Sequence, residues 1–97
     1  MKTQELSTIF MALSQEVRLE IYKLLVKNSL EGLQPTEIAK KLNIPKSTLS
    51  FHLSLLKNAG LCTKTKKGKS YFYKPNCSKI KATMDFLHKD CVSCQNK

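Results

Sequence analysis

The segment from Pro45 to Gly60, PKSTLSFHLSLLKNAG, limits the possible folds more than any other part of this chain. At about 100° per residue, a helix here divides its side chains between two sides. The side that can pack carries Leu49, His52, Leu53 and Leu56. The opposite side, which is mostly small and polar, carries Ser47, Ser50, Phe51, Ser54 and Asn58. Small hydroxyl side chains let a helix lie close to a groove wall and bond phosphates or base edges. The segment therefore predicts a helix that is suited to reading DNA.

Three shorter helices are expected before this segment. An apolar repeat at i, i+3, i+4 and i+7 begins at Leu6 and predicts the first helix. Ser14 is expected to cap a second helix that runs to about Val26. Pro35 suits the first turn of a short third helix, and a break before Pro45 ends it. A short helix, a tight turn and a longer helix together predict a helix-turn-helix.

The residues after Gly60 predict a β-hairpin and one more helix. Residues 61–74 contain two short β-prone runs around Gly68, which can take the positive φ of a hairpin turn. A final helix is expected from about Ser78. Residues 1–97 then form a single domain, mainly α with a β-hairpin wing, in the order α-α-α-α-β-β-α. This order is that of a winged helix-turn-helix.

The charge of the chain favours a polyanionic partner. There are 17 Lys and Arg against 7 Asp and Glu, which gives a net charge of +10. Lysines cluster in the hairpin at Lys64, Lys66, Lys67 and Lys69. No apolar run approaches the roughly 20 residues of a membrane span, and the N-terminus lacks a signal-peptide pattern, so we expect a cytoplasmic location. An enzyme is not expected, because there is no acid/base pair, phosphate-binding glycine loop or partnered nucleophile outside the C-terminal tail.

Three segments together resemble the ArsR family of winged-helix repressors, which are bacterial metal and thiol sensors. ALSQEVRLEIYKLL is similar to the second-helix signature of the family around Arg18, STLSFHLSLLKNAGL to its recognition helix, and KKGKSYFYKP to its wing. The resemblance covers nearly the whole chain. It implies a homodimer, joined through the first and last helices, that binds an imperfect palindrome in double-stranded DNA and leaves it when an inducer binds.

The resemblance also implies which residues face DNA. Residues at the front of the recognition helix would enter the major groove, and lysines of the wing would contact phosphates. The expected contacts are Lys46, Ser47, Thr48, Ser50, Phe51, Lys66, Lys67 and Lys69. Two interpretations of Phe51 stay open, contact with a thymine methyl group or packing on a neighbouring loop. His52, at the edge of the packing side, is expected to be half-buried and bonded to the backbone.

Four cysteines without a secretion signal favour reduced thiols, a metal site or redox chemistry over structural disulfides. A heptad over the C-terminal segment predicts a seam by which two helices meet. Its members are Cys77, Ile80, Met84, Leu87, Cys91 and Cys94. Cys91 and Cys94 form a C-x-x-C pair that suits a thiophilic ion, and Cys77 or a cysteine of the partner subunit could complete a three-sulfur site. By itself, Cys77 is expected to be a small buried apolar residue, and Cys62 a buried structural thiol.

The resemblance implies an inducer for the C-x-x-C pair. The cysteine pair that the family carries at the start of the third helix is absent here. Members with vicinal cysteines just after the last helix respond to trivalent arsenic or antimony, whereas Val92 and Ser93 separate the two thiols here. No cofactor is obligatory, and zinc is the weaker candidate because His88, Cys91 and Cys94 lack an evident fourth ligand. A disulfide or persulfide switch, and a winged-helix interaction module without a sensor role, stay open as alternatives.

Overall fold

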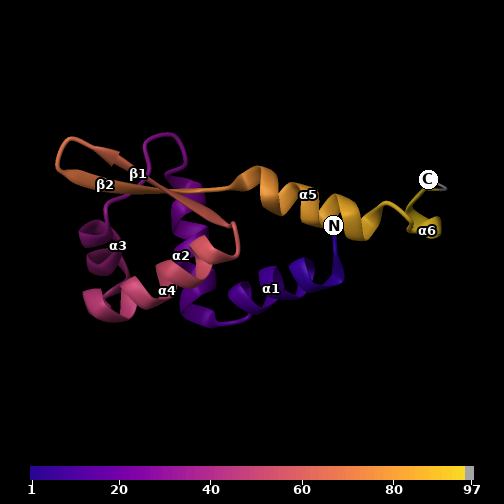
Figure 1. Ribbon diagram of the computed structural model, residues 1–97, viewed down its shortest axis with the longest axis horizontal. Helices are drawn as coiled ribbons and strands as arrows, with labels where there is room; N and C mark the ends of the chain where they lie inside the picture. Colours follow the sequence, from indigo (N-terminus) through magenta and orange to yellow (C-terminus); the bar gives the residue numbers. More distant parts are fainter. Residues whose placement is uncertain (96–97) are drawn as a thin grey trace.

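Four helices, a two-stranded hairpin and two further helices follow one another in the computed structural model, which describes residues 1–95 and the side chains of residues 1–93 (Figure 1). The elements are α1 (Thr3–Leu13), α2 (Glu16–Lys27), α3 (Pro35–Leu42), α4 (Lys46–Asn58), β1 (Cys62–Lys67), β2 (Ser70–Pro75), α5 (Cys77–His88) and α6 (Val92–Gln95). Their order confirms the predicted winged helix-turn-helix and adds the short α6. Within residues 1–95, no helix is long and apolar enough to cross a membrane.

Local capping decides where α1 ends and α2 begins. The side chain of Gln15 accepts a hydrogen bond from the Arg18 N–H at 3.0 Å, and α2 starts at Glu16. The expectation that Ser14 caps α2 is therefore wrong. The Ser14 hydroxyl instead donates to the carbonyl oxygen of Met11 at 2.9 Å, which satisfies one of the last carbonyls of α1.

The helix-turn-helix is bounded by the residues that predicted it. Pro35 is the first residue of α3, and the carboxylate of Glu37 accepts from the N–H of Gln34 at 3.0 Å. Asn43 ends α3 in the left-handed conformation, with a φ of 54°. Gly60 follows α4 with a φ of 77°, as expected for a residue that ends a helix.

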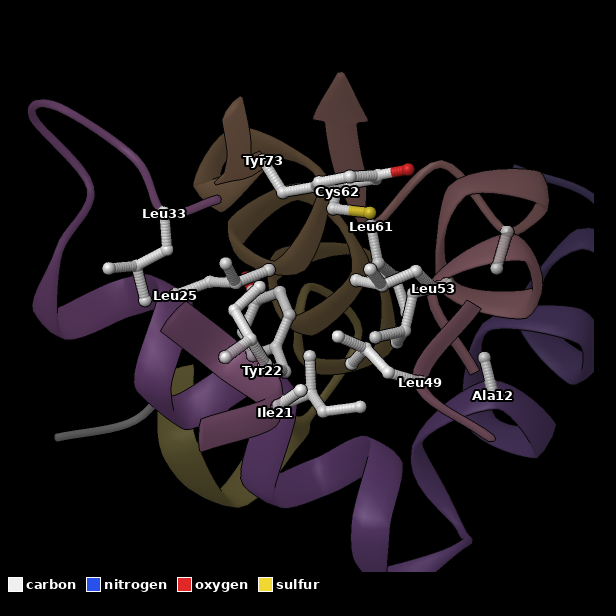
Figure 2. Packing of buried hydrophobic residues seen from close by; sticks show 14 of the residues in the cluster. Ala12, Ile21, Tyr22, Leu25, Leu33, Leu49, Leu53, Leu61, Cys62 and Tyr73 are labelled. Carbon is white, nitrogen blue, oxygen red and sulfur yellow. The ribbon is translucent and has the colours of Figure 1, made fainter. Parts of the chain in front are cut away.

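The hydrophobic core forms around α2 (Figure 2). Ile21 and Leu25 of α2 are fully buried, as are Ile38 of α3 and Leu61 just before β1. The packing side predicted for α4 is confirmed, because α4 buries Leu49, His52, Leu53 and Leu56. Each buried leucine contributes about 1.5–3 kcal/mol relative to exposure. This packing fixes the rotation of α4 about its axis, so the serine side of the helix faces outward.

The wing is attached to the body of the protein at its base. β1 and β2 pair antiparallel along their whole length. The other edge of β2 bonds the loop after α2, where Leu33 and Tyr73 exchange two N–H···O bonds of 3.0 and 2.8 Å. Gly32 permits this approach, because its φ is 81° and a Cβ at this position would lie 2.8 Å from the carbonyl oxygen of Tyr73.

α1 and α5 lie at the end of the molecule opposite the tip of the wing (Figure 1). The molecule measures 50 × 24 × 21 Å along its principal axes. Lys79 of α5 reaches Glu5 of α1, with 2.6 Å between Nζ and Oε2. Large apolar side chains of these two helices remain exposed, namely Phe10, Met11, Met84 and Leu87. This end of the molecule therefore presents apolar surface to solvent.

Candidate nucleic-acid interface

The five residues of α4 that are predicted to contact DNA lie on its exposed side. They are Lys46, Ser47, Thr48, Ser50 and Phe51. Pro45, which precedes the helix, provides no side-chain acceptor for the first N–H groups of α4. Such N–H groups at a helix N-terminus are available to an anion such as a phosphate. The exposed side of α4 thus combines hydroxyl groups, one lysine and backbone donors at a single helix end.

His52 lies on the buried side of α4 and contacts Arg18 of α2. Only 7% of its surface is exposed, and its Nδ1 is 3.2 Å from Nη1 of Arg18. Because a guanidinium group only donates hydrogen bonds, Nδ1 accepts, and the neutral ring carries its proton on Nε2. Burial, and then the charge of Arg18, lower the pKa of His52 below its ordinary value. The expectation of a half-buried histidine bonded to the backbone is therefore wrong in both respects.

Arg18 joins α1 to α4 through contacts that were not predicted from the sequence. Its Nε donates to the carbonyl oxygen of Ala12 at 2.8 Å, and its Nη2 lies 3.5 Å from that of Met11. Together with the contact to His52, these bonds tie the end of α1 to the middle of α4. The available signal was that Arg18 is the single arginine in a chain whose other basic residues are lysines. A guanidinium group can satisfy several acceptors at once, which an ammonium group does less well.

The wing carries its lysines on an aromatic support. Lys67 pairs with Ser70, which leaves Gly68 and Lys69 as a two-residue turn, and Gly68 takes the predicted positive φ, at 62°. Ammonium groups also lie over aromatic rings of β2. The distances to the ring centroids are 4.3 Å from Lys64 to Tyr71, 5.8 Å from Lys66 to Tyr71 and 5.4 Å from Lys67 to Phe72. These contacts restrict the long lysine stems on both faces of the hairpin.

The end of the molecule that carries α3, α4 and the wing is strongly basic. Its exposed lysines are Lys40, Lys41, Lys46, Lys57, Lys64, Lys66, Lys67 and Lys69. In the part of the chain that the structure describes, no lysine of these elements forms an ion pair with a carboxylate. Figure 1 shows the N-terminal end of α4 and the tip of the wing at this same end. Among the described residues, no carboxylate neutralises the lysine charge at this end.

The two cysteines that were predicted to be buried differ in their surroundings. Cys62, the first residue of β1, is buried as expected, and burial raises the pKa of its thiol to about 11. Cys77 is exposed, so the expectation that it is a small buried residue is wrong. It is the first residue of α5, which therefore starts one residue earlier than the expected start at Ser78. Asn76 caps the helix, because its side chain accepts a hydrogen bond from the Lys79 N–H.

The predicted inducer cysteines lie beyond the end of α5. Cys91 follows that helix, and its Sγ is 3.4 Å from the Ser93 hydroxyl oxygen. The side chain of Cys94 lies outside the described residues. α5 ends at His88, so the heptad seam does not continue through Cys91 and Cys94 on one helix.

Because α5 is about 16 Å long between its first and last residues, one chain does not bring Cys77 and Cys91 to a common ion. Within the described residues, no three His, Cys, Asp or Glu side chains gather as a metal site.

Known proteins are similar to this chain in sequence and in the arrangement of helices and wing. A family model described as a helix-turn-helix domain matches residues 13–64, from the end of α1 into β1. The transcriptional activator HlyU of Vibrio cholerae is 32% identical over 78 residues, which cover 80% of this chain and 69% of HlyU. The cadmium resistance transcriptional regulatory protein CadC homolog of Staphylococcus aureus is 34% identical over 87 residues, which cover 87% of this chain and 69% of that protein.

The fold agrees with these sequence relatives. An ArsR-like transcriptional regulator from Rhodococcus sp. RHA1 has a solved structure that matches 96% of this chain and 85% of its own, with a TM-score of 0.83 and 25% identity. The helix-turn-helix match, the related regulators and the shared winged fold agree with the recognition helix and wing described above. On this evidence the chain belongs to the ArsR family of winged-helix transcriptional regulators.

Proposed function

We propose that this regulator is a homodimeric repressor that binds an imperfect palindrome in double-stranded DNA and leaves it when an inducer binds. The observation that carries the proposal is that the N-terminal end of α4, whose serine side is exposed, and the tip of the lysine-rich wing lie at one end of the molecule (Figure 1). An exposed helix of the right width enters a major groove, and a basic hairpin beside it reaches the flanking phosphates. The absence of carboxylate partners for these lysines in the described residues supports a polyanionic ligand.

Two chains are proposed to join through α1 and α5. These helices expose Phe10, Met11, Met84 and Leu87, and a chain of 97 residues has only a modest core of its own. A second copy that covers this surface would bury it and leave both wings at the outer ends of the pair. The two α4 helices could then enter successive major grooves, about 34–36 Å apart. A symmetric pair of reading helices matches the symmetry of a palindrome.

The residues of α4 and of the wing are assigned different tasks. Lys46, Ser47 and Ser50 would contact base edges and nearby phosphates, and Thr48 the backbone beside them. In the wing, Lys66, Lys67 and Lys69 would contact phosphates. Phosphate contacts set affinity and salt dependence, whereas base contacts choose the sequence.

Cys91 and Cys94 are proposed as the inducer site for trivalent arsenic or antimony. Thiolates bind thiophilic ions, and the name of the CadC homolog refers to resistance to cadmium, another such ion. Cys91 lies three residues after the end of α5, and its N–H donates to the carbonyl oxygen of His88 at 3.0 Å, so an ion there would act on a helix of the proposed dimer contact. A third sulfur, where one is needed, would come from the partner subunit, because Cys77 of the same chain lies at the far end of α5. A coupling of about 1–3 kcal/mol would be enough to weaken DNA binding markedly.

Fluorescence anisotropy with a labelled duplex from upstream of the gene for this protein tests the proposal. Arsenite, zinc and a peroxide are added separately under otherwise reducing conditions. Arsenite should release the wild-type protein and leave the double variant Cys91→Ser, Cys94→Ser bound. The matched control Cys62→Ser removes a buried thiol and should still respond.

Each other outcome changes a named part of the proposal. Release of the double variant by arsenite would remove Cys91 and Cys94 from the sensor, and release by the peroxide alone would assign them a redox role. Equal binding to scrambled DNA would leave an interaction module without operator choice. A reporter gene placed behind the operator in the bacterial cytoplasm tests repression. A fall in its transcription when the protein is present supports repression, whereas a rise in transcription would give the chain the activating role named for HlyU.

A further inference from the structure

Phe51 is a large apolar side chain that the fold leaves uncovered. It is 60% exposed, whereas the other large apolar side chains in the middle of α4, such as Leu49 and Leu53, are buried. Its ring lies against the adjacent His52, edge to face at 5.5 Å between centroids. Because most of its surface is exposed in the described residues, burial against a neighbouring loop does not account for it, which favours contact with a thymine methyl group.

Three of the four side chains around Phe51 on the helix surface are small and polar. Residues three and four positions away share its face; one of them is the half-buried Leu55, and the others are Ser47, Thr48 and Ser54. All three are exposed and much shorter than a phenyl ring. The ring therefore projects beyond its surroundings on the side of α4 that the proposed function turns toward DNA.

The chemistry of a phenyl ring restricts what it can recognise in a major groove. The ring neither donates nor accepts a conventional hydrogen bond, so burying a guanine O6 or a cytosine amino group against it would leave that group without a partner. The C5-methyl group of thymine is the apolar feature that B-form DNA displays in this groove. Contact with that methyl group buries apolar surface on both sides and costs no hydrogen bond.

We propose that Phe51 is a specificity-determining residue that packs on the C5-methyl group of one thymine in each half of the operator. This inference rests on the proposed function, because it requires α4 to lie in the major groove. It adds the base that the helix selects and the atom through which it is selected. The hydroxyl groups of Ser47 and Ser50 are unselective donors and acceptors, so the aromatic contact would contribute discrimination that they lack.

Deoxyuridine substitution tests the proposal, because uracil differs from thymine by this methyl group alone. The probe is the duplex that the wild-type protein enriches from a randomised DNA pool, with each thymine replaced in turn. Loss of one buried methyl group should weaken binding about fourfold, and symmetric replacement in both half-sites about fifteenfold. Phe51→Ala should bind the unmodified duplex more weakly and show no further loss at that thymine.

A matched control separates this contact from a general effect of apolar surface. Leu30 is 90% exposed and lies in the loop between α2 and α3, away from α4. Leu30→Ala should keep the full penalty at the same thymine. Both substituted side chains are exposed, so both variants should unfold at about the temperature of the wild type.

The outcomes distinguish this inference from the function on which it rests. Selective, salt-dependent binding without any uridine penalty, or a penalty that persists in Phe51→Ala, would overturn the role of Phe51 and leave the DNA-binding function standing. An enriched duplex without a thymine in each half-site would do the same. A pool from which no sequence is enriched would overturn the proposed function, and this inference with it.

Discussion

Removing two lysines from the wing should change the salt dependence of DNA binding by a calculable amount. The variant is Lys66→Gln, Lys69→Gln, at two exposed positions that form no ion pair within the described residues. Each phosphate neutralised on B-form DNA contributes about 0.9 to the slope of log K against log salt. Two lysines in each of two subunits should therefore lower the slope by about 3.6.

The size of this change makes it easy to measure. Between about 50 and about 200 mM salt, the wild-type protein should lose affinity by about two orders of magnitude more than the variant does. Anisotropy titrations at several salt concentrations measure the slope directly. Sequence preference should change little, because phosphate contacts carry no base information.

A control with the same loss of net charge isolates the wing. Lys2→Gln, Lys23→Gln removes two exposed lysines, one of them paired with Glu20, from the N-terminus and α2. Its slope should stay close to that of the wild type, since these lysines lie outside the proposed contact. Equal slopes for the wing variant and the wild type would refute phosphate contacts by the wing. An equal change in both variants would show that overall charge, not the wing, sets the salt dependence.

Two further predictions concern stability. Gly32→Ala should lower the free energy of unfolding by about 2–4 kcal/mol in urea denaturation, because its φ is 81° and the new Cβ would meet the Tyr73 carbonyl. Gly68→Ala, at a φ of 62° in open space, should lower it by about 1 kcal/mol. Equal losses would contradict the close approach at the base of the wing. The lowered pKa of His52 means that the unfolded chain takes up a proton more readily than the folded one, so stability should fall as the pH drops through the ordinary histidine value of 6.5. The urea midpoints at about pH 7.5 and about pH 5.5 should differ more for the wild type than for His52→Gln. An equal drop in both proteins would show that protonation of His52 does not cause the loss of stability.

The recognition helix could be predicted because its signals are local. The apolar period of α4 fixes which side packs, and Pro45 and Gly60 mark its ends by their restricted or permissive backbones. The turn at Gly68 follows from the same kind of signal. These features depend on residues within one or two turns of each other, and the structure confirms them.

Contacts between distant segments could not be predicted in this way. His52 and Arg18 are 34 positions apart, and only the packing of α2 on α4 brings their side chains together. The approach of Gly32 to Tyr73 likewise requires the wing to be in place. Arg18 stands out in the sequence as the single arginine, but its partners, like those of Gly32, depend on the tertiary fold.

The C-terminal heptad shows another limit of periodicity. Its apolar members Met84 and Leu87 are exposed in the single chain, which fits a seam that another chain covers. The same pattern continues to Cys91, although α5 ends at His88. A repeat of apolar residues thus indicates which side of a helix can pack against another helix, but it does not determine where the helix ends.

We propose above that this winged-helix regulator selects a DNA sequence through α4. The most direct measurement is the ratio of its affinities for the enriched duplex and for a scrambled duplex of equal length and composition, at about 150 mM salt. A selective regulator should bind the enriched duplex about a thousandfold or more tightly, with two chains on each duplex. A ratio near one would contradict sequence selection by α4, because the wing lysines would then attract DNA without any choice of sequence.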